Sequence, residues 1–181
     1  GMFKNALSFN GNLSSWNVSS VTNMSSMFEN AESFAGDLST WDVSNVTSMR
    51  EMFTGTIVFQ SDLSNWNVAN VTDMFRMFKL SSYNGDLSSW DVSSVNNMQA
   101  MFNSNTAFNG DLSGWNVVSL TNMHNMFVNA SSFNSDISSW DVSNVTIMSN
   151  AFKNAESFNQ NLSTWDIASV TIMEGVFDGQ T

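Results

Sequence analysis

Apolar residues recur along this chain in columns at a fixed period. The tryptophans show the period most clearly, because each follows the last by the same step, except that the step from Trp66 to Trp90 is one residue shorter. They are Trp16, Trp41, Trp66, Trp90, Trp115, Trp140 and Trp165. Self-similarity at a fixed period of this length is the signature of a repeat architecture. We therefore expect a single domain over residues 1–181, made of about seven coils that stack on one another, with no evident caps.

Two different patterns alternate within each repeat. The stretch from Val46 to Phe53 places Val, Met, Met and Phe at i, i+3, i+6 and i+7, which predicts a short helix. A Ser or Asn precedes each such stretch, as Asn45 does here, and is a natural N-cap. The stretch Asp-Leu-Ser-Ser-Trp is too short for a helix and predicts a strand followed by a turn. The expected fold class is therefore an α/β repeat, with a parallel sheet on one side and helices on the other.

Methionine and phenylalanine are confined to a few columns. All 13 methionines occupy two columns, and 14 of the 15 phenylalanines occupy two more. Tyr83 replaces Phe once, and Phe75 alone stands outside the columns. The one shorter step of the repeat arises between Phe78 and Tyr83, so we expect the missing residue to fall in a connection. Stripes that recur in every repeat at the same phase indicate core packing, not a cofactor site.

The phrase around each tryptophan resembles a known class of repeats. Leu-x-x-Trp-x-Val overlays the second half of the leucine-rich repeat consensus, with Trp where the Asn ladder usually runs. Residues 136–145, DISSWDVSNV, with TIMSNAF after them, resemble the BspA-like repeats of bacterial surface lipoproteins and cell-wall proteins. The resemblance covers essentially the whole chain. It implies a right-handed, leucine-rich-repeat-like solenoid displayed at the cell surface or secreted, and it implies no reaction.

The charge of the chain excludes several classes of partner. There are 16 acidic residues against 5 basic ones, for a net charge of -11. No basic stripe is present to displace counterions from phosphates, so we expect no nucleic acid partner. No apolar run is long enough to span a membrane. The chain has no cysteine, which excludes disulfides and thiolate metal sites.

Polar residues that the apolar columns leave over form the candidate binding face. In a leucine-rich-type coil they would line the concave surface. They are Asp37, Asp62, Asp86, Asp111, Asp136, Ser39, Ser64, Ser88, Ser113 and Ser138. Neighbouring aspartates at rung spacing repel one another unless they are hydrogen-bonded, solvated or bridged by cations.

Three interpretations of this Asp/Ser face remain open. The first is a structural ladder in which Asx and Ser side chains bond the backbone. The second is a binding surface for a protein or glycan ligand, with ice or a crystalline polysaccharide as a further variant. The third is bridging of the carboxylates by Ca²⁺, whose preferred ligands are oxygens, although no EF-hand loop is present and no dedicated metal site is predicted.

No catalytic group is evident in the sequence. His124 is the only histidine and is predicted to be an exposed residue on a helix. No Ser-His-Asp set can be assembled around it. We therefore expect a protein that is not an enzyme and needs no cofactor.

Both ends of the array are expected to expose apolar residues. Gly1-Met2-Phe3 aligns in phase with Gly175-Val176-Phe177, so Met2, Phe3, Val176 and Phe177 are candidate end-face contacts. Either the array continues in a longer protein, or another chain covers the ends, or copies stack head to tail into a filament. The leading hypothesis is a cell-surface binding or adhesion module, and the alternative is a structural protein that stacks end to end.

Overall fold

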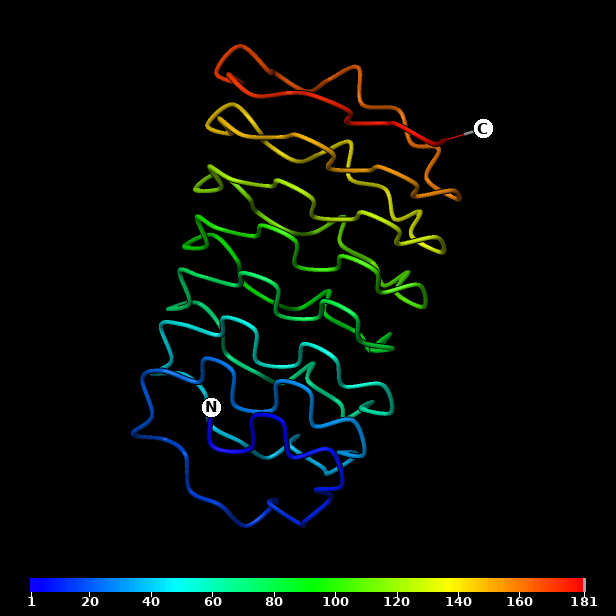
Figure 1. Ribbon diagram of the computed structural model, residues 1–181. Coiled ribbons are helices and arrows are strands. Elements are labelled where there is room, and N and C mark those ends of the chain that lie inside the picture. The colour runs from blue at the N-terminus through cyan, green and yellow to red at the C-terminus, as the bar shows by residue number, and fades with distance from the viewer. Residues whose placement is uncertain (181) are drawn as a thin grey trace.

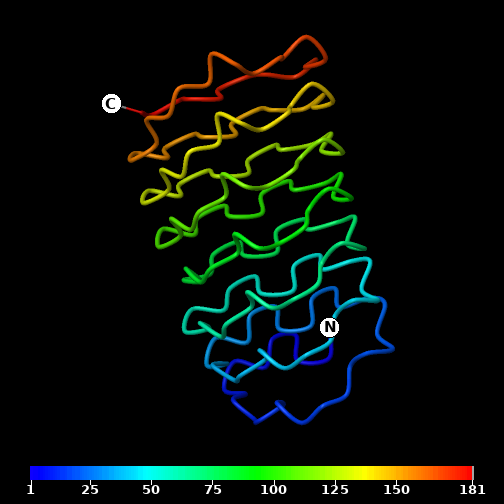
Figure 2. The ribbon, with the colours of Figure 1, turned by 180° about the vertical axis from the view of Figure 1, so that it is seen from behind.

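The repeats form coils that lie one above another along the molecule. The computed structural model describes residues 1–180, which rise from the first coil to the last without interruption (Figures 1 and 2). Within these residues there is no helix and no extended strand; turns and irregular backbone make up nearly all of each coil. Regular pairing is limited to isolated parallel bridges at one position of each repeat, namely Asn23–Ser48, Ser48–Asp73, Asp73–Asn97, Asn97–Asn122, Asn122–Ile147 and Ile147–Ile172.

The predicted fold class was therefore wrong. The chain is not an α/β repeat solenoid, and it lacks the strand and helix of leucine-rich repeats. The physical reason lies in where the backbone N–H and C=O groups of each half of the repeat find their hydrogen-bond partners. We call these halves the Met segments and the Trp segments. The Met segments are residues 23–31, 48–56, 73–81, 97–105, 122–130, 147–155 and 172–180. The Trp segments are residues 12–21, 37–46, 62–71, 86–95, 111–120, 136–145 and 161–170.

Each Met segment is a pair of tight turns. In the first one, Met27 N–H donates to Met24 O at 3.2 Å and Ala31 N–H donates to Phe28 O at 2.9 Å. The third residues of these turns, Ser26 and Asn30, have φ of 54° and 56°. A positive φ at that position is the mark of a type II turn and is incompatible with a continuous right-handed helix. The turns nevertheless direct side chains inward every three or four residues, which is the spacing that predicted a helix.

Four other N–H groups of the first Met segment join one coil to the next. Met24 N–H donates to Ser48 O at 3.0 Å, and Phe28 N–H donates to Met52 O at 3.0 Å. The two residues with positive φ do the same, because Ser26 and Asn30 donate to Arg50 O and Thr54 O, both at 2.7 Å. The chain is thus stitched along this side by main-chain hydrogen bonds, although no strand forms.

The Trp segments are joined by side chains instead. Within one segment, Trp41 N–H closes a turn on Leu38 O at 3.1 Å, so the expected strand is absent. Among residues 1–180 no main-chain hydrogen bond connects one Trp segment to another. The indole Nε1–H of Trp41 donates instead to Leu13 O of the coil below, at 3.1 Å. The predicted concave face rested on that strand and loses its basis.

The residues predicted to cap helices also act between coils. The side-chain amides of Asn45, Asn70 and Asn144 donate to Ser19 O, Ser44 O and Val118 O of the preceding coil at 2.8, 2.7 and 2.9 Å. No helix follows them. Their N-cap assignment was therefore wrong, and their amides instead tie adjacent Trp segments together.

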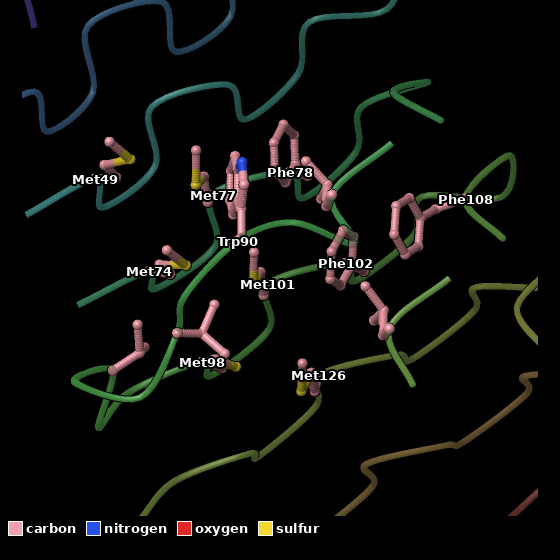
Figure 3. Packing of buried hydrophobic residues seen from close by; sticks show 14 of the residues in the cluster. Met49, Met74, Met77, Phe78, Trp90, Met98, Met101, Phe102, Phe108 and Met126 are labelled. Atoms are coloured by element: carbon pink, nitrogen blue, oxygen red, sulfur yellow. The ribbon is translucent and has the colours of Figure 1, made fainter. Parts of the chain in front are cut away.

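The predicted core columns are confirmed. Rings of successive coils stack, with centroids 5.6 Å apart for Phe102 and Phe127 and 5.5 Å for Phe127 and Phe152. Tyr83 takes the place of a phenylalanine in the second ring column, 4.7 Å from Phe78. Figure 3 shows Trp90 among buried residues of its own and the preceding coil, including the rings of Phe78 and Phe102 and the side chains of Met77, Met98 and Met101. Since residues 1–180 form no helix, none of their segments is a candidate membrane-spanning helix.

Candidate binding face

The predicted aspartates all open the same local turn. In each Trp segment that carries one, the Asp side chain accepts a hydrogen bond from the backbone N–H of the serine two residues later, as in an Asx turn. The pairs are Asp37–Ser39, Asp62–Ser64, Asp86–Ser88, Asp111–Ser113 at 2.9 Å each and Asp136–Ser138 at 3.0 Å. Asn12 and Asn161 make the same bond at 3.0 Å. The structural ladder is therefore present, and it orients every carboxylate alike.

These bonds favour the ionised form of the aspartates. The backbone N–H of Ser88, followed by its hydroxyl, lowers the pKa of Asp86 below its ordinary value, while the charge of Asp111 opposes the shift. For Asp62 the Ser64 hydroxyl and N–H lower the pKa against the repulsion of Asp86 and Asp37. Hydrogen bonding to a carboxylate stabilises its charged form. These hydrogen bonds thus offset the repulsion between rungs locally.

The predicted serines link the coils in a second way. Their backbone carbonyls accept hydroxyl groups from the coil above, at 2.9 Å from Ser139 Oγ to Ser113 O and 2.7 Å from Thr164 Oγ1 to Ser138 O. The Asp and Ser columns hence lie together, exposed or half-buried, along one side of the stack. The structure brings the predicted site residues together, and it gives each of them a structural bond as well.

Charge is segregated between the two sides of the molecule. The Trp segments carry nine aspartates and no basic residue, namely Asp37, Asp42, Asp62, Asp86, Asp91, Asp111, Asp136, Asp141 and Asp166. All five basic residues lie in the Met segments or in the equivalent first stretch, namely Lys4, Arg50, Arg76, Lys79 and Lys153. The Asp/Ser face therefore carries only negative charge.

No metal centre is formed by the part of the chain that the structure describes. In residues 1–180 there is no group of three or more His, Cys, Asp or Glu side chains placed to hold an ion. Each aspartate of the face has one carboxylate oxygen bonded to backbone, and its acidic neighbours lie one rung away. The geometry gives no support to Ca²⁺ bridging.

A cluster on the Met side was missed by the sequence reasoning. The guanidinium groups of Arg50 and Arg76 lie over the ring of Phe75, 4.3 and 4.5 Å from its centroid. Arg50 also pairs with Asp73 at 2.8 Å and Arg76 with Glu51 at 3.4 Å. The sequence did carry a signal, because Phe75 lies outside every aromatic column. The chain also has only two arginines: Arg76 follows Phe75 directly, and Arg50 lies one period before Phe75. Such departures from a repeat single out a local feature that the period alone hides.

The remaining predicted residues fall into different environments. Met2 and Phe177 are 69% and 48% exposed, whereas Val176 is buried and Phe3 is half-buried against Phe9. His124 is half-buried, not exposed as predicted, and its Nδ1 lies 3.0 Å from Ser149 O. Only two of the four predicted end-face contacts are thus open to solvent.

The turns, the period and the aromatic stacks together define a tandem-repeat protein of stacked irregular coils. A family described as "Mycoplasma protein of unknown function, DUF285" matches residues 1–84 and again residues 79–181, and the chain belongs to this family. No curated protein and no solved structure shows significant similarity to the chain. The leucine-rich repeat assignment is not upheld, and the more specific resemblance to BspA-like repeats is not confirmed.

Proposed function

We propose that this protein is a non-enzymatic binding module displayed at the cell surface or secreted, which holds a protein ligand through its Asp/Ser face. The observation that carries the proposal is the segregation of charge, with nine aspartates and no basic residue on the Trp segments. The aspartates of this face are also held in one orientation by their Asx turns. Side chains that are already fixed lose little conformational entropy when a ligand binds.

The chemistry of the face favours a ligand with a basic surface. A surface of one sign attracts a partner of the opposite sign and speeds its association, and the effect weakens as salt screens the charges. A neutral glycan would instead use the Ser and Thr hydroxyls, but several of these already donate to carbonyls of the neighbouring coil. A basic protein is therefore the ligand we propose.

Charge-neutral variants of the face test this proposal. Asp62, Asp86 and Asp111 changed together to Asn keep the turn, because Asn12 and Asn161 make the same bond in the native chain. With lysozyme as a basic protein probe, we expect the variant to bind at least tenfold more weakly by surface plasmon resonance at an ionic strength of about 0.1 M. The native chain should lose most of its binding as salt is raised.

A control with the same loss of charge separates the face from the net charge. Glu32, Glu156 and Glu174 are exposed and lie outside the Trp segments. Their triple change to Gln should leave binding of the probe within about twofold of the native chain, an estimate that assumes screening over roughly 10 Å. Equal weakening in both variants would show that only net charge matters and would refute a defined face. Binding of a neutral glycan array that survives both variants would favour the glycan ligand.

The alternative function is end-to-end assembly into a filament. Met2 and Phe177, which are 69% and 48% exposed, are the candidate contacts for such an assembly. Size-exclusion chromatography at rising concentration distinguishes the two, since a chain that remains monomeric while it binds the basic probe is a binding module. Long rods under negative stain would favour the structural role. Labelling of intact cells with antibody tests the proposed surface location.

A further inference from the structure

A basic patch spans two successive coils of the Met side. We define it as Arg50 of one coil and Phe75, Arg76 and Lys79 of the next. Residues 149–150, which are equivalent to Phe75 and Arg76 in a later coil, are Ser-Asn. The later coil stacks without an aromatic ring or a guanidinium at these positions. The side chains of the patch are therefore not needed for stacking and are free to serve another purpose.

The two guanidinium groups of the patch are presented to solvent. Both lie over the ring of Phe75, 4.3 and 4.5 Å from its centroid, and the ring stabilises cations placed over it. The side chains of Arg50 and Arg76 are 41% and 40% exposed. Their ion-pair partners, Asp73 and Glu51, are only 24% exposed each. The cations of the patch are therefore more open to an incoming group than the carboxylates that pair with them.

The patch also has cationic groups that no carboxylate of residues 1–180 uses. Arg50 and Arg76 pair through Nη1, and Nη2 of each makes no hydrogen bond within these residues. Lys79 forms no ion pair in the same part of the chain. Burial, followed by the positive charge of Arg76, lowers the pKa of Lys79. An anion placed beside Lys79 would oppose both effects, because it favours the charged form.

We infer that the basic patch of one copy of this chain binds the Asp/Ser face of a second copy. The inference rests on the proposed function of that face and names its ligand. On the face, Oδ1 of Asp86 and of Asp111 accepts a backbone N–H, which leaves Oδ2 of each to accept from another molecule. The Trp segments carry no basic residue of their own to compete for these oxygens. Guanidinium and carboxylate groups form some of the strongest hydrogen bonds between side chains.

The spacing of the charges favours a second copy over an unrelated acidic partner. Asp86 and Asp111 of the face lie in successive coils. Arg50 and Arg76 of the patch do as well. One stacking interval sets both spacings, and the core rings in this part of the molecule repeat every 5.6 to 5.7 Å. Two cations one coil apart thus meet two carboxylates one coil apart, a match that an unrelated acidic protein does not share.

The contact joins different surfaces of the two copies. Because the patch lies on the Met side and the face on the Trp side, each bound copy still offers one free patch and one free face. Such a contact is heterologous and does not close. The net charge of -11 opposes it at long range. At an ionic strength of about 0.15 M, charges more than roughly 8 Å apart are largely screened, so the repulsion is damped while the close pairs at the patch remain.

Sedimentation velocity at an ionic strength of about 0.15 M tests the patch. We expect the sedimentation coefficient of the native chain to rise with concentration. Phe75→Ser combined with Arg76→Asn gives the patch the residues of 149–150 and should weaken association at least tenfold. Arg76 has φ of 53°, a conformation that Asn adopts readily, so this variant should fold. Lys153→Asn removes the same charge from a more distant coil and should associate like the native chain.

A second patch variant and the face variant extend the test. Arg50→Ser restores the residue that Ser25 provides in the preceding coil, and it should weaken association in the same direction. The triple Asn variant of the face should also lose association, although it lowers the net negative charge and so reduces the repulsion between copies. Circular dichroism checks that each variant is folded.

Mixing the two kinds of variant shows which surfaces meet. The double patch variant keeps an intact face, and the triple Asn variant keeps an intact patch. Each should be monomeric alone, and together they should form a one-to-one complex. End-to-end stacking would instead persist in each variant alone. Association that either variant retains unchanged, or a mixture that forms no complex, overturns the inference.

Lysozyme binding separates this inference from the proposed function. The double patch variant should bind lysozyme as the native chain does. A native chain that binds lysozyme but stays monomeric overturns the inference and leaves the proposed function standing. Binding of a polyglutamate peptide to the patch of a monomeric chain would likewise overturn it and assign the patch to another acidic partner. If the native chain fails to bind lysozyme, the proposed function fails, and the mixing experiment still decides whether patch and face meet.

Discussion

The two sides of each coil are joined to neighbouring coils by different kinds of hydrogen bond. On the Met side, Ser26 and Phe28 reach the next coil through backbone N–H groups at 2.7 and 3.0 Å. On the Trp side, the bonds between coils come from side chains, as with Trp115 Nε1 to Leu87 O at 2.9 Å. Main-chain bonds tolerate many side chains, whereas side-chain bonds demand particular ones. Trp accordingly occurs in all seven Trp segments, and in six of them its indole donates to the preceding coil.

The Met side has a constraint of its own, which concerns backbone conformation. Positive φ occurs twice in each Met segment, and most of these positions carry Asn, Ser or Gly. Leu80 is an exception, with φ of 55° and a side chain that is 51% exposed. A branched apolar residue is disfavoured in this region of φ. The positions of positive φ on the Met side therefore favour residues that adopt the left-handed conformation at little cost.

The largest effect is expected from the removal of a Trp on the side that depends on side chains. Trp115→Ala should lower the free energy of unfolding by about 3–5 kcal/mol, through the cavity and the lost hydrogen bond. Trp115→Phe keeps most of the ring and should cost about 1–2 kcal/mol, since Leu87 O loses its indole donor. Urea unfolding measures both. A Phe variant as stable as the native chain would show that the indole bond contributes nothing to joining the Trp segments.

A smaller effect of opposite sign is expected on the Met side. Leu80→Asn should raise the free energy of unfolding by about 1 kcal/mol, because Asn visits the left-handed region more readily than Leu. Leu7→Asn is the matched control, since Leu7 is 52% exposed and does not have a positive φ. Thermal unfolding should show a higher Tm for the first variant alone. A similar rise in both would attribute the gain to the loss of an exposed leucine.

The side-chain hydrogen bond of Asn70, on the Trp side, should contribute less to the free energy of unfolding. Asn70→Ala removes the side-chain amide bond to Ser44 O and should cost about 0.5–1 kcal/mol. Asn65→Ala, at an exposed position in the same Trp segment, should cost less than half as much. Chemical denaturation of the two variants side by side measures the difference. Equal values would mean that the amide tie is replaced by water without loss.

The smallest individual effects come from the aspartates, and they appear as pH dependence. Backbone and hydroxyl hydrogen bonds lower the pKa of Asp86 and Asp111 in the folded chain. A lowered folded pKa stabilises the protein above the unfolded value of about 3.9, and this stabilisation is lost as pH falls through the folded value. Tm should therefore decline below about pH 4. The triple Asn variant of the face should show a shallower decline, and an identical decline would contradict this account.

Packing was predictable from the sequence because burial follows from the repeat itself. Trp115, Met126 and Phe127 each belong to an apolar column, and all three are almost fully buried. A single repeat is too small to cover such columns alone, so stacking is required. The exposure of Asp86 and its grouping with Asp62 and Asp111 follow from the same period. The columns therefore predicted which residues face the core and which share a surface.

Secondary structure was not predictable in the same way. Met49, Met52 and Phe53 have helical spacing, yet they lie on two turns, with a positive φ at Glu51 and at Gly55. The local pattern is identical for a helix and for turns that face inward every three or four residues. What decides between them is the coil above, whose carbonyls accept N–H groups that a helix would use internally.

The sequence by itself determined the period, the buried columns, the negative charge of the Asp/Ser face and the position of Phe75 outside the aromatic columns. Each of these depends only on residue type and spacing. The tertiary structure decided the backbone. Glu51 N–H donates to Phe75 O and Trp41 Nε1–H to Leu13 O, and in both pairs the acceptor belongs to a neighbouring coil. Hydrogen bonds between stacked coils replace those of helices and strands, so the conformation of one repeat is settled only by its neighbours.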